Sequence, residues 1–235
     1  MLNNKKLYVI IPVRGGSNGI HKKNLYKLGG LTLLERAIIL GQGCKYVDKV
    51  LVSTDDPEMF DISRKYNTSM PALRSSYLAT DTAKTVDVVL DVIEKTKIKD
   101  SYILLLQVTS PLRTSDDLYN FIKKFEDNLH ICDAIVSLTE FDNPHPNKIQ
   151  KIENGFVKSY LGVESMVPRQ ELPKVYKLNG AFYMTSTEIL KKYHTFIPER
   201  TLPFIMPEER SLNLDTIYDL YLLEALIQKR IISFD

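Results

Sequence analysis

The sequence predicts an α/β fold in which a mostly parallel, doubly wound sheet carries helices on both faces. Three continuous apolar runs, at residues 7–13, 49–55 and 102–108, are typical of parallel strands that are buried on both sides. Segments with apolar residues at helical spacing separate these runs, and strands that alternate with helices favour a doubly wound sheet. With 235 residues, 44% of them hydrophobic, the chain has the size of one domain covering residues 1–235.

Four helices are expected before residue 130. Their apolar positions recur at helical spacing in segments 31–40, 55–66, 82–95 and 114–126. Asp56 is a suitable N-cap for the second helix, because Pro57 follows at the first helical position. Ser115 is the expected N-cap of the fourth, with acidic residues in the first turn.

The second half of the chain adds two strands and a closing helix. The strands are expected at residues 132–140 and 176–185. An amphipathic helix should start near Thr216, with Asp219 three residues later.

The alternation of strands and helices stops after Asn143. Residues 148–160 alternate around Asn154 and Gly155, and an Asn-Gly pair in such a setting is a strong hairpin signal. Residues 144–174 are therefore expected to form a small antiparallel arm inserted in the domain. Such an arm could shape a pocket, pair with a second subunit, or do both.

Composition argues against several classes of protein. The formal net charge is +2 and no Lys/Arg run exceeds two residues, so no nucleic-acid surface is expected. Cys44 and Cys132 form neither a metal-binding spacing nor a disulfide framework. The N-terminus has no signal-peptide pattern, and no apolar run approaches the ~18 residues of a membrane span. A cytoplasmic protein without a membrane segment is expected.

The first apolar run ends in a glycine-rich loop with the sequence IIPVRGGSNGIHKKN (residues 10–24). The first strand-to-helix loop of an open α/β sheet is the usual place for a phosphate. Its three glycines would let backbone N–H groups approach an anion: Gly15, Gly16 and Gly19. Arg14 and Lys23 add positive charge. The spacing matches neither a dinucleotide fingerprint nor a P-loop, and an ordinary glycine-rich turn with surface cations is the alternative.

Seven fragments in order across the chain carry a family resemblance. They are RGGSNGIHKKN, VSTDD, LATDTA, LLQVTSPLR, PRQELP, LNGAFY and MPEERSLNLDT. Together they closely resemble the acylneuraminate cytidylyltransferase family. The resemblance implies a Rossmann-like, GT-A-like nucleotidyltransferase that works as a homodimer through the arm. It also implies that CTP and a nine-carbon 2-keto sugar acid give a CMP-sugar and pyrophosphate, with Mg²⁺.

The resemblance also assigns roles at the nucleotide end of the site. The first motif would hold the triphosphate and cytidine through Arg14, Gly15, Gly16, Ser17, Lys23 and Asn24. Arg74 and Thr85 would complete that site, although a surface salt bridge and a capping or buried hydroxyl would explain them equally. Arg14, Lys23 and Asp215 are the expected catalytic residues.

The sugar end should use the later motifs. Gln107, at a strand end, would bond sugar hydroxyls or an N-acyl group, and Arg169 would pair with the sugar carboxylate. Asn179 and Tyr183 would border the same pocket. A loop hydrogen bond for Gln107 and simple packing for Tyr183 are the alternatives.

The metal motif departs from the family pattern. The family typically has Asp-x-Asp, whereas this chain has Asn213-Leu214-Asp215, and Asn18 stands where the commonest family loop has Lys. Mg²⁺ tolerates one carboxylate, so Asp215 and Asn213 are the expected metal ligands. The alternative is that Asp215 caps the helix starting at Thr216 and that the metal site is lost.

Three other functions compete with this interpretation. A cytidylyltransferase for the eight-carbon sugar Kdo would normally have an acidic residue just after Gln107, and QVTSP has none. A glycosyltransferase would need a D-x-D triplet, which the chain lacks. A nucleotide-binding paralogue with weakened catalysis is the third. Which acid is used, sialic, legionaminic or related, cannot be read from spacing; VYKLNGAFY favours the legionaminic type.

Overall fold

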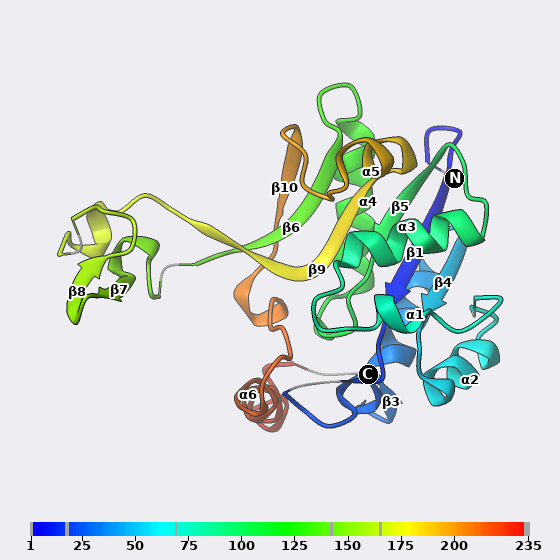
Figure 1. Cartoon of the computed structure of the whole chain (residues 1–235), viewed down its shortest axis with the longest axis horizontal. Helices are drawn as coiled ribbons and strands as arrows, with labels where there is room; N and C mark the ends of the chain where they lie inside the picture. The colour runs from blue at the N-terminus through cyan, green and yellow to red at the C-terminus, as the bar shows by residue number, and fades with distance from the viewer. Residues whose placement is uncertain (1, 17–18, 69, 142, 165, 233–235) are drawn as a thin grey trace.

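The computed structural model describes residues 2–16, 19–68, 70–141, 143–164 and 166–232. A six-stranded sheet with the order β10-β6-β9-β5-β1-β4 forms its centre (Figure 1). Strand β9 runs antiparallel to both of its neighbours, β5 and β6, while the other neighbouring pairs are parallel. The mostly parallel α/β sheet expected from the sequence is confirmed.

The main strands agree with the apolar runs except at one edge. They are β1 (Lys6–Pro12), β4 (Lys49–Ser53), β5 (Ser101–Leu105), β6 (Ala134–Glu140), β9 (Tyr176–Ser186) and β10 (Thr201–Ile205). The sequence did not predict β10, which is short and contains Pro203. Proline fits an edge strand because that position needs no ladder hydrogen bond from its nitrogen. Two short strands, β2 (Lys27–Leu28) and β3 (Leu31–Thr32), form a separate hairpin.

Six α-helices occur in the described part of the chain. They are α1 (Leu33–Gly43), α2 (Pro57–Lys65), α3 (Thr85–Lys95), α4 (Ser115–Asp127), α5 (Thr187–Tyr193) and α6 (Ile217–Gln228). Only α5 was not expected from the sequence. Among the described residues, no helix is both long enough and apolar enough to span a bilayer.

The helix caps test the sequence predictions residue by residue. Asp56 caps α2 as expected, because its carboxylate accepts the N–H of Met59. The prediction of Ser115 as the cap of α4 is wrong. Thr114 is the cap, since its hydroxyl accepts the N–H of Asp117, whose carboxylate accepts the N–H of Thr114. This reciprocal pair is a capping box.

The two faces of the sheet bury separate apolar clusters. Strand β1 feeds both, because successive side chains of a strand point to opposite faces. Val9 and Ile11 pack in the cluster that includes α1 and α4, while Ile10 packs in the cluster that includes α3 and α5. Helices therefore cover both faces, which confirms the doubly wound arrangement.

The predicted arm projects from the body of the molecule (Figure 1). Its hairpin pairs β7 (Gln150–Glu153) with β8 (Phe156–Ser159). Asn154 and Gly155 have φ angles of 54° and 80°, as a two-residue turn with left-handed central residues requires. The hairpin is confirmed, and the treatment of the whole chain as one domain stays a prediction.

Candidate active site

A cavity of about 540 Å³ opens at the carboxyl ends of β1 and β5. Four segments far apart in sequence line it: the loop after β1, the segment before α3, the loop after β5 and residues 213–215. In an open α/β sheet, this edge is where ligands bind. The predicted site residues on its wall are Arg14, Gly16, Lys23, Asn24, Arg74, Thr85, Gln107, Asn213 and Asp215.

The three glycines of the first loop differ in what a side chain at each position would contact. A Cβ on Gly15 would lie 2.9 Å from the carboxylate of Asp56, and a Cβ on Gly19 would lie 2.0 Å from the backbone oxygen of Asp215. Both positions therefore need glycine for contacts within the protein. A Cβ on Gly16 would meet nothing within 4 Å, so its backbone is open to a ligand. Ser17 and Asn18 lie outside the described residues.

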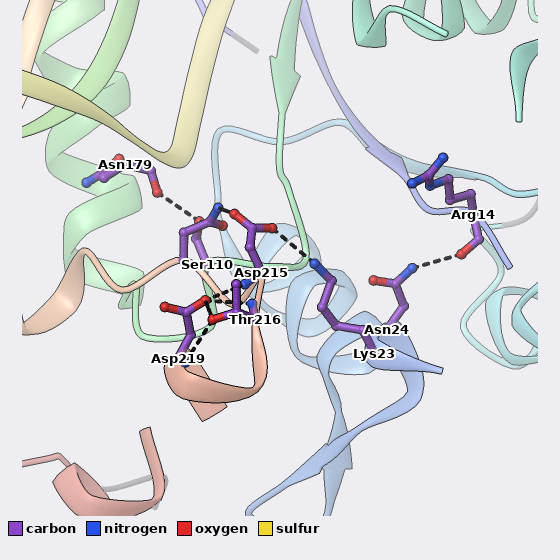
Figure 2. Close-up of polar contacts among 9 residues, drawn as sticks. Arg14, Lys23, Asn24, Ser110, Asn179, Asp215, Thr216 and Asp219 are labelled. Carbon is purple, nitrogen blue, oxygen red and sulfur yellow. Dashed lines mark hydrogen bonds and ion pairs between the residues drawn. The ribbon is translucent and has the colours of Figure 1, made fainter. Parts of the chain in front are cut away.

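Two side chains hold the loop from behind. The amide of Asn24 donates to the backbone oxygen of Arg14 at 2.9 Å (Figure 2). Arg74 donates to the backbone oxygen of Val13 at 2.6 Å and pairs with Asp55 at 3.1 Å. Asp55 also accepts the N–H of Gly15 at 3.3 Å. Asp55 and Arg74 thereby fix the backbone on both sides of Arg14.

Arg74 is not the surface salt bridge of the alternative interpretation. Its side chain is only 4% exposed, and its Nε has no hydrogen-bond partner in the described structure. Burial lowers the pKa of Arg74, while the hydrogen bond to Asp55 opposes that shift. Contact between Arg74 and a nucleotide stays a prediction.

An ion pair at the cavity joins the glycine loop, near the start of the chain, to the segment that precedes α6. Lys23 Nζ lies 3.1 Å from Asp215 Oδ1 (Figure 2). The amide nitrogen of Asn213 donates to the other oxygen of the same carboxylate. The amide oxygen of Asn213 in turn accepts from the hydroxyl of Ser110 at 3.4 Å. Arg14 pairs with Asp81 at 2.5 Å elsewhere on the cavity wall. Two ion pairs therefore line the cavity, Arg14–Asp81 and Lys23–Asp215, and each joins segments that are distant in sequence.

Asp215 does not cap α6. Thr216 is the N-cap, because its hydroxyl accepts the N–H of Asp219 and the carboxylate of Asp219 accepts the N–H of Thr216. Burial alone would raise the pKa of Asp219, but the hydrogen bonds from Thr216 and the N–H of Asp215 outweigh burial and lower it. This capping box leaves the carboxylate of Asp215 facing Lys23 and Asn213 (Figure 2).

Gly180 allows the polar side chains of Gln107 and Ser110 to approach the backbone of β9. Its φ is +75°, and a Cβ there would lie 2.8 Å from Gln107 Oε1 and 3.0 Å from Ser110 Oγ. An L-residue would be strained in this backbone conformation and would displace both side chains. Gln107 reaches the cavity at the end of β5, as expected from the sequence.

Asn179 is committed to a buried network instead of the cavity. It is 2% exposed. Its amide oxygen accepts from Ser137 Oγ at 2.6 Å, and its amide nitrogen donates to Ser211 Oγ at 3.0 Å. The network orders the bulge where the β6–β9 register shifts between Val136 and Leu138. Contact between Asn179 and a sugar stays a prediction, and it would require these bonds to break.

Tyr183 and Arg169 also lie away from this cavity. Tyr183 packs in the apolar cluster beneath α3, with its ring 6.2 Å from that of Phe196, and burial raises its pKa. Arg169 is exposed on the arm, which Figure 1 shows apart from the sheet. Sequence reasoning assigned no role to Asp55, Asp81 or Ser110. The signal for Asp55 was its place just after a buried strand.

Comparison with known proteins agrees with this geometry. A pseudaminic acid cytidylyltransferase of Campylobacter jejuni is 32% identical over 216 residues, which are 90% of this chain and 91% of that protein. A CMP-N,N'-diacetyllegionaminic acid synthase of Legionella pneumophila is 29% identical over 95% of this chain and 97% of that protein. The structure of a CMP:2-keto-3-deoxy-manno-octonic acid synthetase complexed with CTP shares the fold, with a TM-score of 0.70 at 16% identity. The aligned region covers 96% of this chain and 100% of the chain in that structure. Because a model of the cytidylyltransferase family matches residues 8–232, the chain belongs to that family.

Proposed function

We propose that this chain transfers the CMP group of CTP to a nine-carbon 2-keto sugar acid and releases pyrophosphate. The observation that carries the proposal is the pairing of Lys23 with Asp215 at the wall of the cavity. It brings a cation of the glycine loop and a carboxylate of the 213–215 segment to one place. Relatives at about 30% identity are named for pseudaminic, legionaminic and N-acylneuraminic substrates, which supports this substrate class.

The reaction needs positioning and charge neutralisation more than it needs a covalent intermediate. The anomeric oxygen of the sugar acid forms a bond to the α-phosphorus of CTP, and the bond from that phosphorus to the bridging oxygen of pyrophosphate breaks. Arg14 and Lys23 would hold phosphate oxygens, and the open backbone of Gly16 would add an N–H donor. Thr85, at the first position of α3, would lie beside the nucleotide.

The donor set beside the cavity fits Mg²⁺. Asp215 offers one exposed carboxylate, and Asn213 would offer its amide oxygen if its amide turned over, since its nitrogen now donates to Asp215 and its oxygen accepts from Ser110. No group of three or more His, Cys, Asp or Glu side chains among the described residues could hold a metal, so a closed protein cage is not built here. Mg²⁺ is normally bound by one or two carboxylates together with substrate phosphates and waters. When bound, it would neutralise charge on the phosphates, and Asp215 would hold it with help from Asn213.

The sugar end of the proposal requires a second subunit. Gln107 would bond a sugar hydroxyl or N-acyl group from within the cavity. Arg169 lies on the arm, so its contact with a sugar carboxylate is proposed to occur in the cavity of the partner subunit. The hairpin of the arm supports pairing, because Ile152, Phe156 and Val157 are 81%, 71% and 70% exposed. A homodimer is therefore proposed, with CTP and the sugar acid taken from the cytoplasm.

Sedimentation equilibrium checks the assembly. The native protein should have about twice the chain mass of 27.0 kDa. Deletion of the hairpin at residues 150–159 should give a folded monomer that uses the sugar poorly. A native monomer at micromolar concentration would contradict the role of the arm.

A substrate panel tests the function itself. The purified protein is mixed with CTP, Mg²⁺ and sialic, legionaminic or pseudaminic acid, and pyrophosphate release is measured, with Kdo as the eight-carbon control. Release with at least one nine-carbon acid and CMP-sugar formation in equal amount are expected. Activity with Kdo alone, or with none of the acids, would sink the proposal.

A further inference from the structure

A second cavity, of about 680 Å³, lies on the other side of the loop that follows β5. It is lined by side chains of α1, by the start of α4 and by residues 231–232. Val108 contributes to both cavities, and the other described residues that line them differ. The second cavity is therefore separate from the proposed nucleotide site, and nothing in the proposed reaction uses it.

Arg113 is the notable charge in this wall. It is 8% exposed, Nη1 donates to the backbone oxygen of Ala181 at 2.7 Å, and the guanidinium lies 5.7 Å from the centre of the Phe182 ring. No carboxylate of the described residues pairs with Arg113, and its other N–H groups have no acceptor there. None of those nitrogens is sealed away from solvent, so they remain accessible at the cavity. Arginine has five N–H donors, and most of them are unused here.

The other arginines of the cavity are committed to the protein. Arg210 forms two hydrogen bonds of 2.9 Å to the carboxylate of Asp117. Arg36 donates to the backbone oxygen of Leu28. Burial lowers the pKa of Arg113 to about 9, which leaves the guanidinium charged at neutral pH. A buried charge without a counterion is costly, and an anion in the cavity would offset that cost.

The lining also includes Glu209, whose carboxylate lies 3.8 Å from Arg210 Nη1, and an apolar side that would contact the body of a ligand. Leu31, Leu40 and Ile231 give the cavity an apolar side, and Ser115 adds a small polar group at the start of α4. We infer that this cavity binds a small organic anion, with its carboxylate or phosphate on Arg113 and a short apolar body against α1 and residue 231. The inference does not depend on the sugar proposed above.

Methyl NMR of the full-length protein, labelled at Ile, Leu and Val, tests the inference. Hexanoate and butyl phosphate are the probes, and hexan-1-ol is the uncharged control. Both anions, or one of them, should shift the methyl signals of Leu40 and Ile231 at concentrations where hexan-1-ol does not. Saturating CTP should shift Val88, which lines the first cavity only, and leave the probe shifts in place.

Two sets of variants separate charge from folding. Arg113→Gln keeps a donor for Ala181 but loses the cation, and it should abolish the difference between hexanoate and hexan-1-ol. Ser115 is exposed and its hydroxyl caps nothing, so Ser115→Glu should fold normally. Its carboxylate should weaken binding of the anions about tenfold by like-charge repulsion, while Ser115→Gln should not. Equal shifts with hexanoate and hexan-1-ol, shifts confined to the first cavity, or no shift at all would each overturn the inference.

Discussion

Two of the ion pairs beside the cavity, Arg74–Asp55 and Lys23–Asp215, differ in their access to solvent. Arg74 and Asp55 have side chains that are 4% and 27% exposed, and both bond the backbone of the glycine loop. Lys23 is 13% exposed and Asp215 is 61% exposed, and their charged groups pair with each other at the cavity wall. Arg74 and Asp55 therefore hold the backbone of the glycine loop in place, whereas the carboxylate of Asp215 is accessible to a ligand in the cavity.

This difference in exposure separates a pair that stabilises the fold, Arg74–Asp55, from a pair proposed to serve the reaction, Lys23–Asp215. Removing one partner of a buried pair leaves an uncompensated charge and costs about 3–5 kcal/mol. Exposed pairs contribute about 0–1 kcal/mol to stability. The Lys23–Asp215 pair should lie closer to that range, because water reaches the carboxylate of Asp215, which is 61% exposed. In the proposed reaction, Lys23 and Asp215 would exchange each other for substrate or metal at little cost to the fold.

Replacement of Arg74 should have the largest effect on stability. Arg74→Met should lower the free energy of unfolding by about 3–5 kcal/mol, because Asp55 and the oxygen of Val13 lose their buried partner. Urea denaturation measures this, and Arg64→Met is the control, since Arg64 is 66% exposed and pairs only with Asp61 at 4.0 Å. A loss below about 1 kcal/mol for Arg74→Met would erase the distinction between the two pairs.

Replacement of Lys23 should affect turnover and spare the fold. Lys23→Ala should reduce turnover at least ~100-fold, because a preorganised cation on the phosphates is worth a few kcal/mol. Lys22→Ala is a matched control, since the neighbouring Lys22 pairs with Glu58 outside the cavity. The free energy of unfolding should change by less than about 1 kcal/mol in both variants. Equal turnover in the two variants would remove Lys23 from the chemistry.

Replacement of Asp219 should have the smallest effect on stability. It tests whether the capping box of α6 acts independently of the neighbouring Asp215. The pKa of Asp219 lies below its ordinary value of 3.8 in the folded protein. A carboxyl of this kind adds stability above its unfolded pKa and loses it as the pH falls through the folded value. Asp219→Asn should cost about 1 kcal/mol at neutral pH, as loss of a cap does, and the difference from the wild type should shrink below about pH 4. Denaturation at several pH values measures this, and a large loss of turnover would contradict it.

Local rules in the sequence predicted most of the fold. Apolar runs located five of the six main strands, and Asn154-Gly155 placed the hairpin of the arm. The N-cap of α4 was misplaced by one residue, because Thr114 and Ser115 are both small hydroxyl residues. The capping box with Asp117 decides between them. Strand β10 was not predicted, because it is short and contains Pro203, and both features weaken the sequence pattern of a strand.

The site was less predictable than the fold, because spacing along the chain does not show which way a side chain points. Asn179 looked like a sugar ligand at a strand bordering the pocket. In the structure its side chain bonds Ser137 and Ser211 in a buried network beside the β6–β9 register shift, and its contact with a sugar stays a prediction. Arg169 follows a family motif, but only the fold shows that the arm carries it away from its own cavity.

The exposed carboxylate of Asp215 is proposed to hold Mg²⁺ during the reaction, and a magnesium titration tests this proposal most directly. Pyrophosphate release is measured against Mg²⁺ concentration for the wild type, Asp215→Ala and Asn213→Asp. Asp215→Ala should be folded, by its unchanged urea midpoint, and nearly inactive. Asn213→Asp adds a second carboxylate beside Asp215, so its half-saturating Mg²⁺ concentration should fall while its maximal rate stays close to that of the wild type. Three superimposable curves would contradict the account.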